Sequence, residues 1–128
     1  MDRTCAVFDS ATNFNGDIST WKMDNVQYMQ YMFNEASHFN QDLSKWNTGN
    51  VLHMSYMFNK ASQFNSELAQ WNVASVINMN GLFKECSVFN RNISEWSTSS
   101  AADMSNMFES TPFNFQLGAW NTSSVLKM

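Results

Sequence analysis

The chain has 128 residues, a formal net charge of −4 and only seven basic side chains, so it carries no electrostatic footprint for nucleic acid or for an anionic membrane surface. No apolar run approaches the roughly 20 residues of a membrane-spanning helix, and the first residues do not resemble a signal peptide. We therefore expect neither nucleic-acid binding nor membrane insertion by this segment.

A repeat of 25 residues organises the whole sequence. Two aromatic columns show it most clearly: Trp21, Trp46, Trp71, Trp96 and Trp120, and Phe14, Phe39, Phe64, Phe89 and Phe113. One deletion near Pro112 shortens the last interval to 24 residues. We expect 1–128 to form a single repeat array of about four and a half repeats, a segment of a longer protein without capping repeats.

The first half of each repeat, exemplified by "FNQDLSKW" at 39–46, has one Ile/Leu column with polar neighbours on both sides. This pattern predicts a strand of three or four residues that pairs in parallel with the same segment of adjacent repeats. Leu43 and Trp46 are three positions apart, so a straight strand would direct them to opposite faces. We expect the chain to bend near Lys45.

The second half, exemplified by "NVLHMSYMFNKA" at 50–61, has its apolar residues at helical spacing. They form one stripe of a three-turn helix and comprise Val51, Met54, Met57, Phe58 and Ala61. A polar residue such as Asn50 precedes each stripe, where its side chain can cap the first free backbone N–H groups. The predicted fold class is thus an α/β solenoid with one short parallel strand and one helical segment per repeat.

The repeat can be written F-N-x-(D/E)-(I/L)-S-x-W-x4-V-x2-M-x2-M-F-x2-A-S-x-F. It resembles the 25-residue repeat of bacterial surface and mycoplasma lipoprotein-associated proteins, a family similar to the BspA-like leucine-rich repeats. The resemblance extends from about Val7 to Met128. It implies a right-handed leucine-rich-repeat-like coil and a location at the cell surface or outside the cell. It defines a scaffold and supplies no shared catalytic residues.

Ten methionines recur in the repeat, and pairs such as Met54 and Met57 could in principle hold Cu(I) through their thioethers. Their helical spacing, and the leucine at the equivalent position Leu82, favour packing in the core instead. The tryptophan column is interpreted as a structural ladder rather than a row for stacking sugars. The asparagine column is expected to satisfy loop backbone groups by hydrogen bonding.

Function is expected at the polar positions beside the Ile/Leu column, on the outer face of the strands. This candidate binding face comprises Asp17, Ser19, Asp42, Ser44, Glu67, Asn92, Ser94 and Gln116. Its acidic residues are either solvated or bridged by a cation such as calcium, and the absence of a calcium-loop motif favours solvation. We expect no catalytic residue, no metal site and no cofactor, because neither His38 nor His53 has a catalytic or metal-binding partner in register.

Cys5 and Cys86 occupy different columns about three repeats apart, so they are expected to remain free thiols. The leading functional hypothesis is a non-catalytic scaffold of a cell-surface or secreted protein, whose strand face binds a protein in an adhesion-type interaction. The alternatives are a structural spacer or stalk, and a glycan-binding surface. Uncovered ends of the array would also permit end-to-end self-association.

Overall fold

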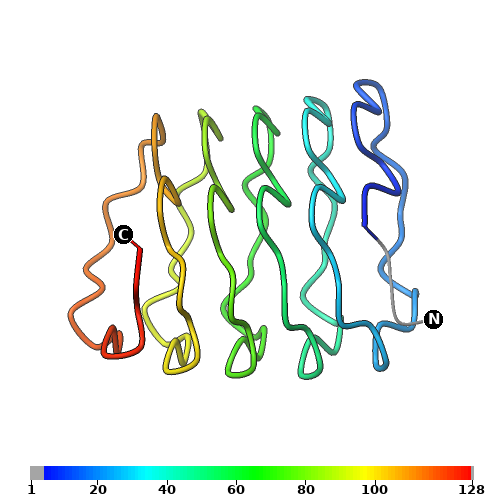
Figure 1. Ribbon diagram of the computed structural model, residues 1–128. Coiled ribbons are helices and arrows are strands. Elements are labelled where there is room, and N and C mark those ends of the chain that lie inside the picture. The colour runs from blue at the N-terminus through cyan, green and yellow to red at the C-terminus, as the bar shows by residue number, and fades with distance from the viewer. Residues whose placement is uncertain (1–4, 128) are drawn as a thin grey trace.

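The repeats lie side by side as a row of similar coils (Figure 1). The structure is a computed structural model that describes residues 5–127. Backbone hydrogen bonds join each coil to the next: the N–H of Phe33 donates to the carbonyl oxygen of Met57, and that of Phe58 to that of Leu82, at 2.9 and 3.0 Å. The sequence repeat is therefore also the structural repeat.

The secondary structure differs from the sequence-based expectation, and the prediction of an α/β, leucine-rich-repeat-like solenoid was wrong. Over residues 5–127 the chain forms no helix and no continuous strand. Pairing is limited to isolated parallel bridges, which successively join Tyr28, His53, Asn78, Asp103 and Lys127. These bridges lie in the half of the repeat that was predicted to be helical, whereas the predicted strand at 39–46 contains no pair.

A helix is excluded in the second half of the repeat, because every other backbone N–H group there donates a hydrogen bond to the next coil. Tyr56, Phe58 and Lys60 donate to carbonyl oxygens of the next coil at 2.8–3.0 Å. The intervening N–H groups of Asn59 and Ala61 close local turns to the residue three positions earlier, at 3.2 and 3.0 Å. An α-helix needs every N–H for its own i−4 carbonyl, so the two patterns are incompatible.

Residues in the left-handed backbone conformation lie at both ends of the segment 56–60, and they maintain the alternation between inter-coil and local hydrogen bonds. Tyr56 and Lys60 have φ values of 55° and 59°, and the other coils repeat these angles at equivalent positions. Tight turns of this kind place side chains at a spacing close to that of a helix, which explains the misleading apolar stripe. The expected cap at Asn50 is also absent, because its side-chain amide donates to the carbonyl of Asp24 instead.

Gly81 replaces tyrosine at the position of Tyr56, and the ring of Tyr56 occupies the space that a side chain there would need. Its φ is +61°, and a Cβ on it would lie 2.5 Å from Cε1 of Tyr56. The ring of Tyr56 stacks on that of Tyr31 at a centroid distance of 5.3 Å. The stack of tyrosine rings therefore ends at Tyr56, whose ring lies against the backbone of Gly81.

Aromatic ladders run through the core along the row. Phe33 stacks on Phe58 at 5.5 Å and Trp46 on Trp71 at 6.3 Å between ring centroids. The indole N–H of Trp46 donates to the carbonyl oxygen of Ile18 in the preceding coil at 3.0 Å. The structural interpretation of the tryptophan column is confirmed, since the buried members pack inside while their one polar atom is satisfied.

The methionines of the repeat fill the same core. Seven of them from the two main columns are at most 6% exposed: Met29, Met32, Met54, Met57, Met79, Met104 and Met107. Leu82 takes a place in the second column and is fully buried. The prediction that these side chains pack as core residues is confirmed.

Both cysteines are free thiols, as expected. Cys86 lies in the buried alanine column, and its Sγ donates to the carbonyl oxygen of Phe58 at 2.7 Å. Burial raises its pKa to about 12. Cys5 is partly exposed. The two thiols therefore differ strongly in accessibility.

Replacing Met57 with alanine is expected to lower the free energy of unfolding by about 2–5 kcal/mol, because it leaves a cavity between packed coils. Met57→Leu is the matched control, since leucine is the native residue one repeat later at Leu82. It should cost less than about 1.5 kcal/mol. Urea unfolding monitored by tryptophan fluorescence measures both, and an Ala variant as stable as the Leu variant would contradict the packing role.

At pH 8 a thiol reagent should label Cys5 quickly and leave Cys86 unmodified in the folded protein. Because the pKa of Cys86 is raised, its unreactive protonated form persists through neutral pH and converts to thiolate only as pH approaches 12. Mass spectrometry should show one label on the native chain and two after denaturation. Rapid double labelling of native protein would be inconsistent with a buried Cys86.

Candidate functional site

A polar hollow of about 360 Å³ crosses three consecutive coils. It is lined by Asn40, Asp42, Ser44, Asn65, Ser66, Glu67, Gln70 and Arg91. The residues come from equivalent parts of neighbouring repeats, so the stacking of the coils brings them together. This polar hollow is the candidate functional site.

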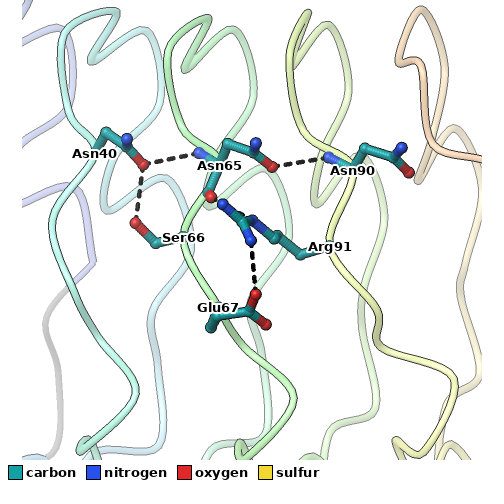
Figure 2. Close-up of polar contacts among 6 residues, drawn as sticks. All are labelled: Asn40, Asn65, Ser66, Glu67, Asn90 and Arg91. Atoms are coloured by element: carbon teal, nitrogen blue, oxygen red, sulfur yellow. Dashed lines mark hydrogen bonds and ion pairs between the residues drawn. The ribbon is translucent and has the colours of Figure 1, made fainter.

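An asparagine ladder forms the upper edge of the polar hollow (Figure 2). The N–H of Asn65 donates to Oδ1 of Asn40 at 2.8 Å, and the N–H of Asn90 donates to Oδ1 of Asn65 at 3.0 Å. The hydroxyl of Ser66 also donates to Asn40 Oδ1, at 2.8 Å. The prediction that this column satisfies backbone groups is confirmed, and the ladder fixes the spacing of the coils at the site.

Arg91 reaches across the polar hollow to the preceding coil. Its Nη1 contacts Oε1 of Glu67 at 2.7 Å, and its Nε donates to the carbonyl oxygen of Asn65 at 2.7 Å. The side chains are 40% and 52% exposed, so the pair contributes at most about 1 kcal/mol to stability. Its main consequence is to hold both charged groups in defined positions.

Asp42 is held in a turn rather than on a strand. Its Oδ1 accepts a hydrogen bond from the N–H of Ser44 at 2.8 Å, and Asp17 with Ser19 and Asn92 with Ser94 repeat this turn at 2.9 and 3.0 Å. The carboxyl and amide positions of this column therefore have a structural role that the strand hypothesis did not include.

Hydrogen bonds from the Ser44 side chain and then from its N–H lower the pKa of Asp42, and Lys45 adds a smaller effect in the same direction. Desolvation and the charge of Asp17 oppose this shift weakly. The pKa of Asp17 is lowered chiefly by the backbone N–H of Ser19. Asp42 is thus an anion at neutral pH.

The structure brings together only part of the candidate binding face predicted from the sequence. Asp42, Ser44 and Glu67 line the polar hollow. The remaining candidates do not line it, and they are Asp17, Ser19, Asn92, Ser94 and Gln116. All eight are at least partly exposed, but the flat strand face on which they were placed does not exist.

Sequence reasoning missed Arg91 and Gln70, and a signal for both was present. The column of Arg91 reads Gly16, Gln41, Ser66, Arg91 and Phe115, and the column of Gln70 reads Thr20, Lys45, Gln70, Glu95 and Ala119. Both change in every repeat, unlike the core columns. Variation within an otherwise regular repeat is the feature that marks exposed, adaptable positions.

The polar hollow combines two carboxylates with one guanidinium and several amides. Over residues 5–127 no three His, Cys, Asp or Glu side chains are grouped so that they could hold a metal ion. The same part of the chain contains no helix long and apolar enough to cross a membrane. The groups present are suited to hydrogen bonding and charge pairing with a polar or basic ligand.

A family model described as "Mycoplasma protein of unknown function, DUF285" matches residues 1–81 and again residues 47–128. The chain belongs to this family. The two overlapping matches cover the whole chain and fit its repeated structure. No curated protein and no solved structure matches the chain.

In this DUF285 chain, Asp42→Ala is expected to lower the free energy of unfolding by about 0.5–1 kcal/mol at pH 7, because the turn loses its hydrogen-bond acceptor. Asp42→Asn is the matched control, since Asn92 closes the same turn natively. It should be close to the parent in stability. Urea titrations of the three proteins test this, and equal stabilities would remove the structural role of Asp42.

The pH dependence follows from the lowered pKa of Asp42. Its contribution is fully present above the ordinary carboxyl pKa of about 4 and is lost as pH falls through the lower folded-state value. The parent should therefore lose stability relative to Asp42→Asn below about pH 4. Unfolding midpoints that fall in parallel for both proteins in acid would contradict this assignment.

Proposed function

We propose that this chain is a non-catalytic repeat scaffold of a cell-surface or secreted protein, and that it binds a protein ligand through the polar hollow. The observation that carries the proposal is the hollow itself. It gathers charged side chains and Gln70 from positions that change between repeats, beside an asparagine column that is constant between repeats. A constant frame with variable exposed positions is the usual arrangement of binding surfaces on repeat proteins.

The charges of the polar hollow favour a basic group on the ligand. Asp42 and Glu67 supply two carboxylates and Arg91 supplies one cation, so the lining has a net negative formal charge. Arg91 pairs with Glu67, which leaves Asp42 as the more available anion. A lysine or arginine side chain of a partner protein would complement it.

The protonation of Asp42 supports binding rather than catalysis. General acid catalysis at neutral pH requires a carboxyl group whose pKa is raised toward 7. The pKa of Asp42 is instead lowered by the hydrogen bonds from Ser44. Asp42 therefore acts as a fixed anion and acceptor.

The rigidity of the site also supports a binding role. The bonds between Asn40, Asn65 and Asn90 connect the coils at the edge of the polar hollow. A surface that is ordered before binding loses less conformational entropy when the ligand arrives. A modest hollow can then give specific binding through a few anchoring contacts.

The placement at the cell surface rests on the repeat pattern. The motif resembles the repeats of bacterial surface and mycoplasma lipoprotein-associated proteins, and the family model carries a Mycoplasma description. An adhesion-type interaction with a protein is the function that fits this location. A glycan ligand would use the same amides and hydroxyls, and glycosidase treatment of the partner distinguishes it from a protein ligand.

A structural spacer is the second candidate, and the regularity of the coil contacts favours it. Turns closed by Asp17, Asp42 and Asn92 recur along the row with nearly equal hydrogen-bond lengths. A spacer needs only this regularity. It would have no ligand whose affinity depends on the polar hollow.

The test is cross-linking capture from host-cell surface and matrix extracts, followed by measurement of the purified partner's Kd. The double variant Asp42→Asn/Glu67→Gln removes both charges with little change in shape and should weaken binding about tenfold or more. Glu85→Lys is the matched control, because Glu85 does not line the hollow and lysine is native at the same position in Lys60. It should bind within about twofold of the parent.

Parent-like binding by the double variant would overturn the proposed site. Failure to obtain any saturable partner would favour the spacer. Binding that is abolished by glycosidase treatment of the partner would indicate a glycan ligand instead of a protein. Urea midpoints of all variants establish that each is folded during the measurement.

A further inference from the structure

One arginine side chain of the row shows how the polar hollow can hold a guanidinium group. Arg91 extends over the preceding coil and contacts two groups there (Figure 2). Its Nε donates to the backbone carbonyl oxygen of Asn65 at 2.7 Å, and its Nη1 contacts Oε1 of Glu67 at 2.7 Å. A carbonyl oxygen of the asparagine column and the carboxylate two positions later therefore form one subsite for a guanidinium group.

The same two groups recur one coil earlier. Asn40 is equivalent to Asn65, and Asp42 is equivalent to Glu67. Asn40 and Asp42 both line the polar hollow. Described coils lie on either side of them, so this pair belongs to the interior of the row.

The side chain that could cover the second pair from within the chain is too short to do so. The position of Arg91 is occupied by Gln41 and Ser66 in the two preceding coils. Gln41 reaches the equivalent carbonyl, since its Nε2 donates to the carbonyl oxygen of Asn15 at 2.9 Å. The Ser66 hydroxyl donates instead to Oδ1 of Asn40 at 2.8 Å. Among residues 5–127, no group donates to the backbone carbonyl oxygen of Asn40.

The carboxylate of Asp42 is also available to a cation. Its Oδ1 accepts from the N–H of Ser44 at 2.8 Å, which closes the turn. The hydrogen bonds from Ser44 lower the pKa of Asp42 more than Lys45 does, and Asp42 forms no ion pair with any described residue. Glu67, in contrast, is already paired with Arg91.

The other coils do not combine the two groups in this way. The carbonyl oxygen of Asn90 has no donor in the described part of the chain either, but the residue two positions later is the neutral Asn92. Phe115 stands there at the position of Arg91. Within residues 5–127, an uncovered asparagine carbonyl beside an unpaired carboxylate is therefore specific to Asn40 and Asp42.

We propose that the ligand of the polar hollow contributes an arginine side chain, whose guanidinium group binds the carbonyl oxygen of Asn40 and the carboxylate of Asp42. This inference rests on the proposed function, since it names the group that the hollow binds. The ligand repeats the contacts of Arg91 one coil earlier. Asp42 is one methylene shorter than Glu67, and a side chain that is not tethered to the row can approach it by that distance.

The two acceptors favour arginine over lysine. A guanidinium group is planar and directs separate N–H groups at separate acceptors, as Arg91 does with its Nε and Nη1. The ammonium group of lysine is a compact point charge. It can pair with Asp42, but it does not reproduce the fixed fork that spans a carbonyl oxygen and a carboxylate.

The experiment is an NMR titration of the 128-residue chain with N-acetylarginine methylamide at constant ionic strength, with the lysine analogue as the second probe. We expect saturable shifts of the backbone N–H signals of Ser44 and Ser66, with a Kd on the order of 10 mM because one exposed ion pair contributes little. The lysine probe should bind about threefold or more weakly. Asp42→Asn keeps a turn that Asn92 closes natively, and should weaken arginine binding about threefold or more.

Ser66→Arg tests the same subsite from within the chain. Arginine is native at the equivalent position in Arg91, so the variant is compatible with the fold, and its guanidinium group should cover Asn40 and Asp42. It should abolish the shift of the Ser44 signal by the arginine probe. Glu85→Lys is the control for added positive charge, because Glu85 does not line the hollow, and it should bind within about twofold of the parent.

Equal affinity for the two probes would overturn the arginine subsite, and so would arginine binding that Asp42→Asn leaves unchanged. Both measurements remain decisive if Ser66→Arg does not fold. A captured protein partner that binds Ser66→Arg like the parent but loses affinity for Asp42→Asn/Glu67→Gln would overturn the subsite and leave the proposed function in place. Selective arginine binding without any captured partner would support the subsite and overturn the adhesion-type function.

Discussion

The alternating use of backbone N–H groups is the constraint on which the rest of this structure depends. Tyr56, Phe58 and Lys60 give their N–H groups to the next coil, while Asn59 and Ala61 use theirs in local turns. Backbone polar groups in the interior must be paired, and this division pairs them without a helix or a continuous strand. Left-handed residues such as Tyr56 and Lys60 make the alternation geometrically possible.

The core follows from that constraint. Because successive coils are held in register by backbone bonds, equivalent side chains lie directly over one another, and flat rings fill the spacing between coils well. Phe39 stacks on Phe64 at 6.0 Å between centroids, and Met57 and Leu82 occupy equivalent buried places. Flexible methionine side chains then fill the gaps that flat rings leave.

The same register creates the polar hollow. The asparagine ladder has a structural origin, since Asn40 and Asn65 accept hydrogen bonds from backbone N–H groups of the neighbouring coil. The register of the coils also determines which exposed positions from different repeats become neighbours, and so places Arg91 beside Glu67. The constant columns therefore build the frame, and the variable columns supply the exposed charged groups, of which Asp42 also closes a turn.

The sequence by itself determined the repeat, its register and the identity of the core. Strict spacing of Trp46, Trp71 and Trp96 can arise only if equivalent residues share equivalent environments, so burial of these columns was predictable.

The local backbone was not predictable from the same pattern. The spacing of Val51, Met54, Met57 and Phe58 suits a helix and a series of tight turns equally well, because both bring every third or fourth side chain to one side. Only the neighbouring coil decided between them, by taking alternate N–H groups of this segment. For the same reason Asp42 and Glu67 could be identified as exposed from the sequence, but their association with Arg91 and Gln70 depended on contacts one repeat away, which no local pattern specifies.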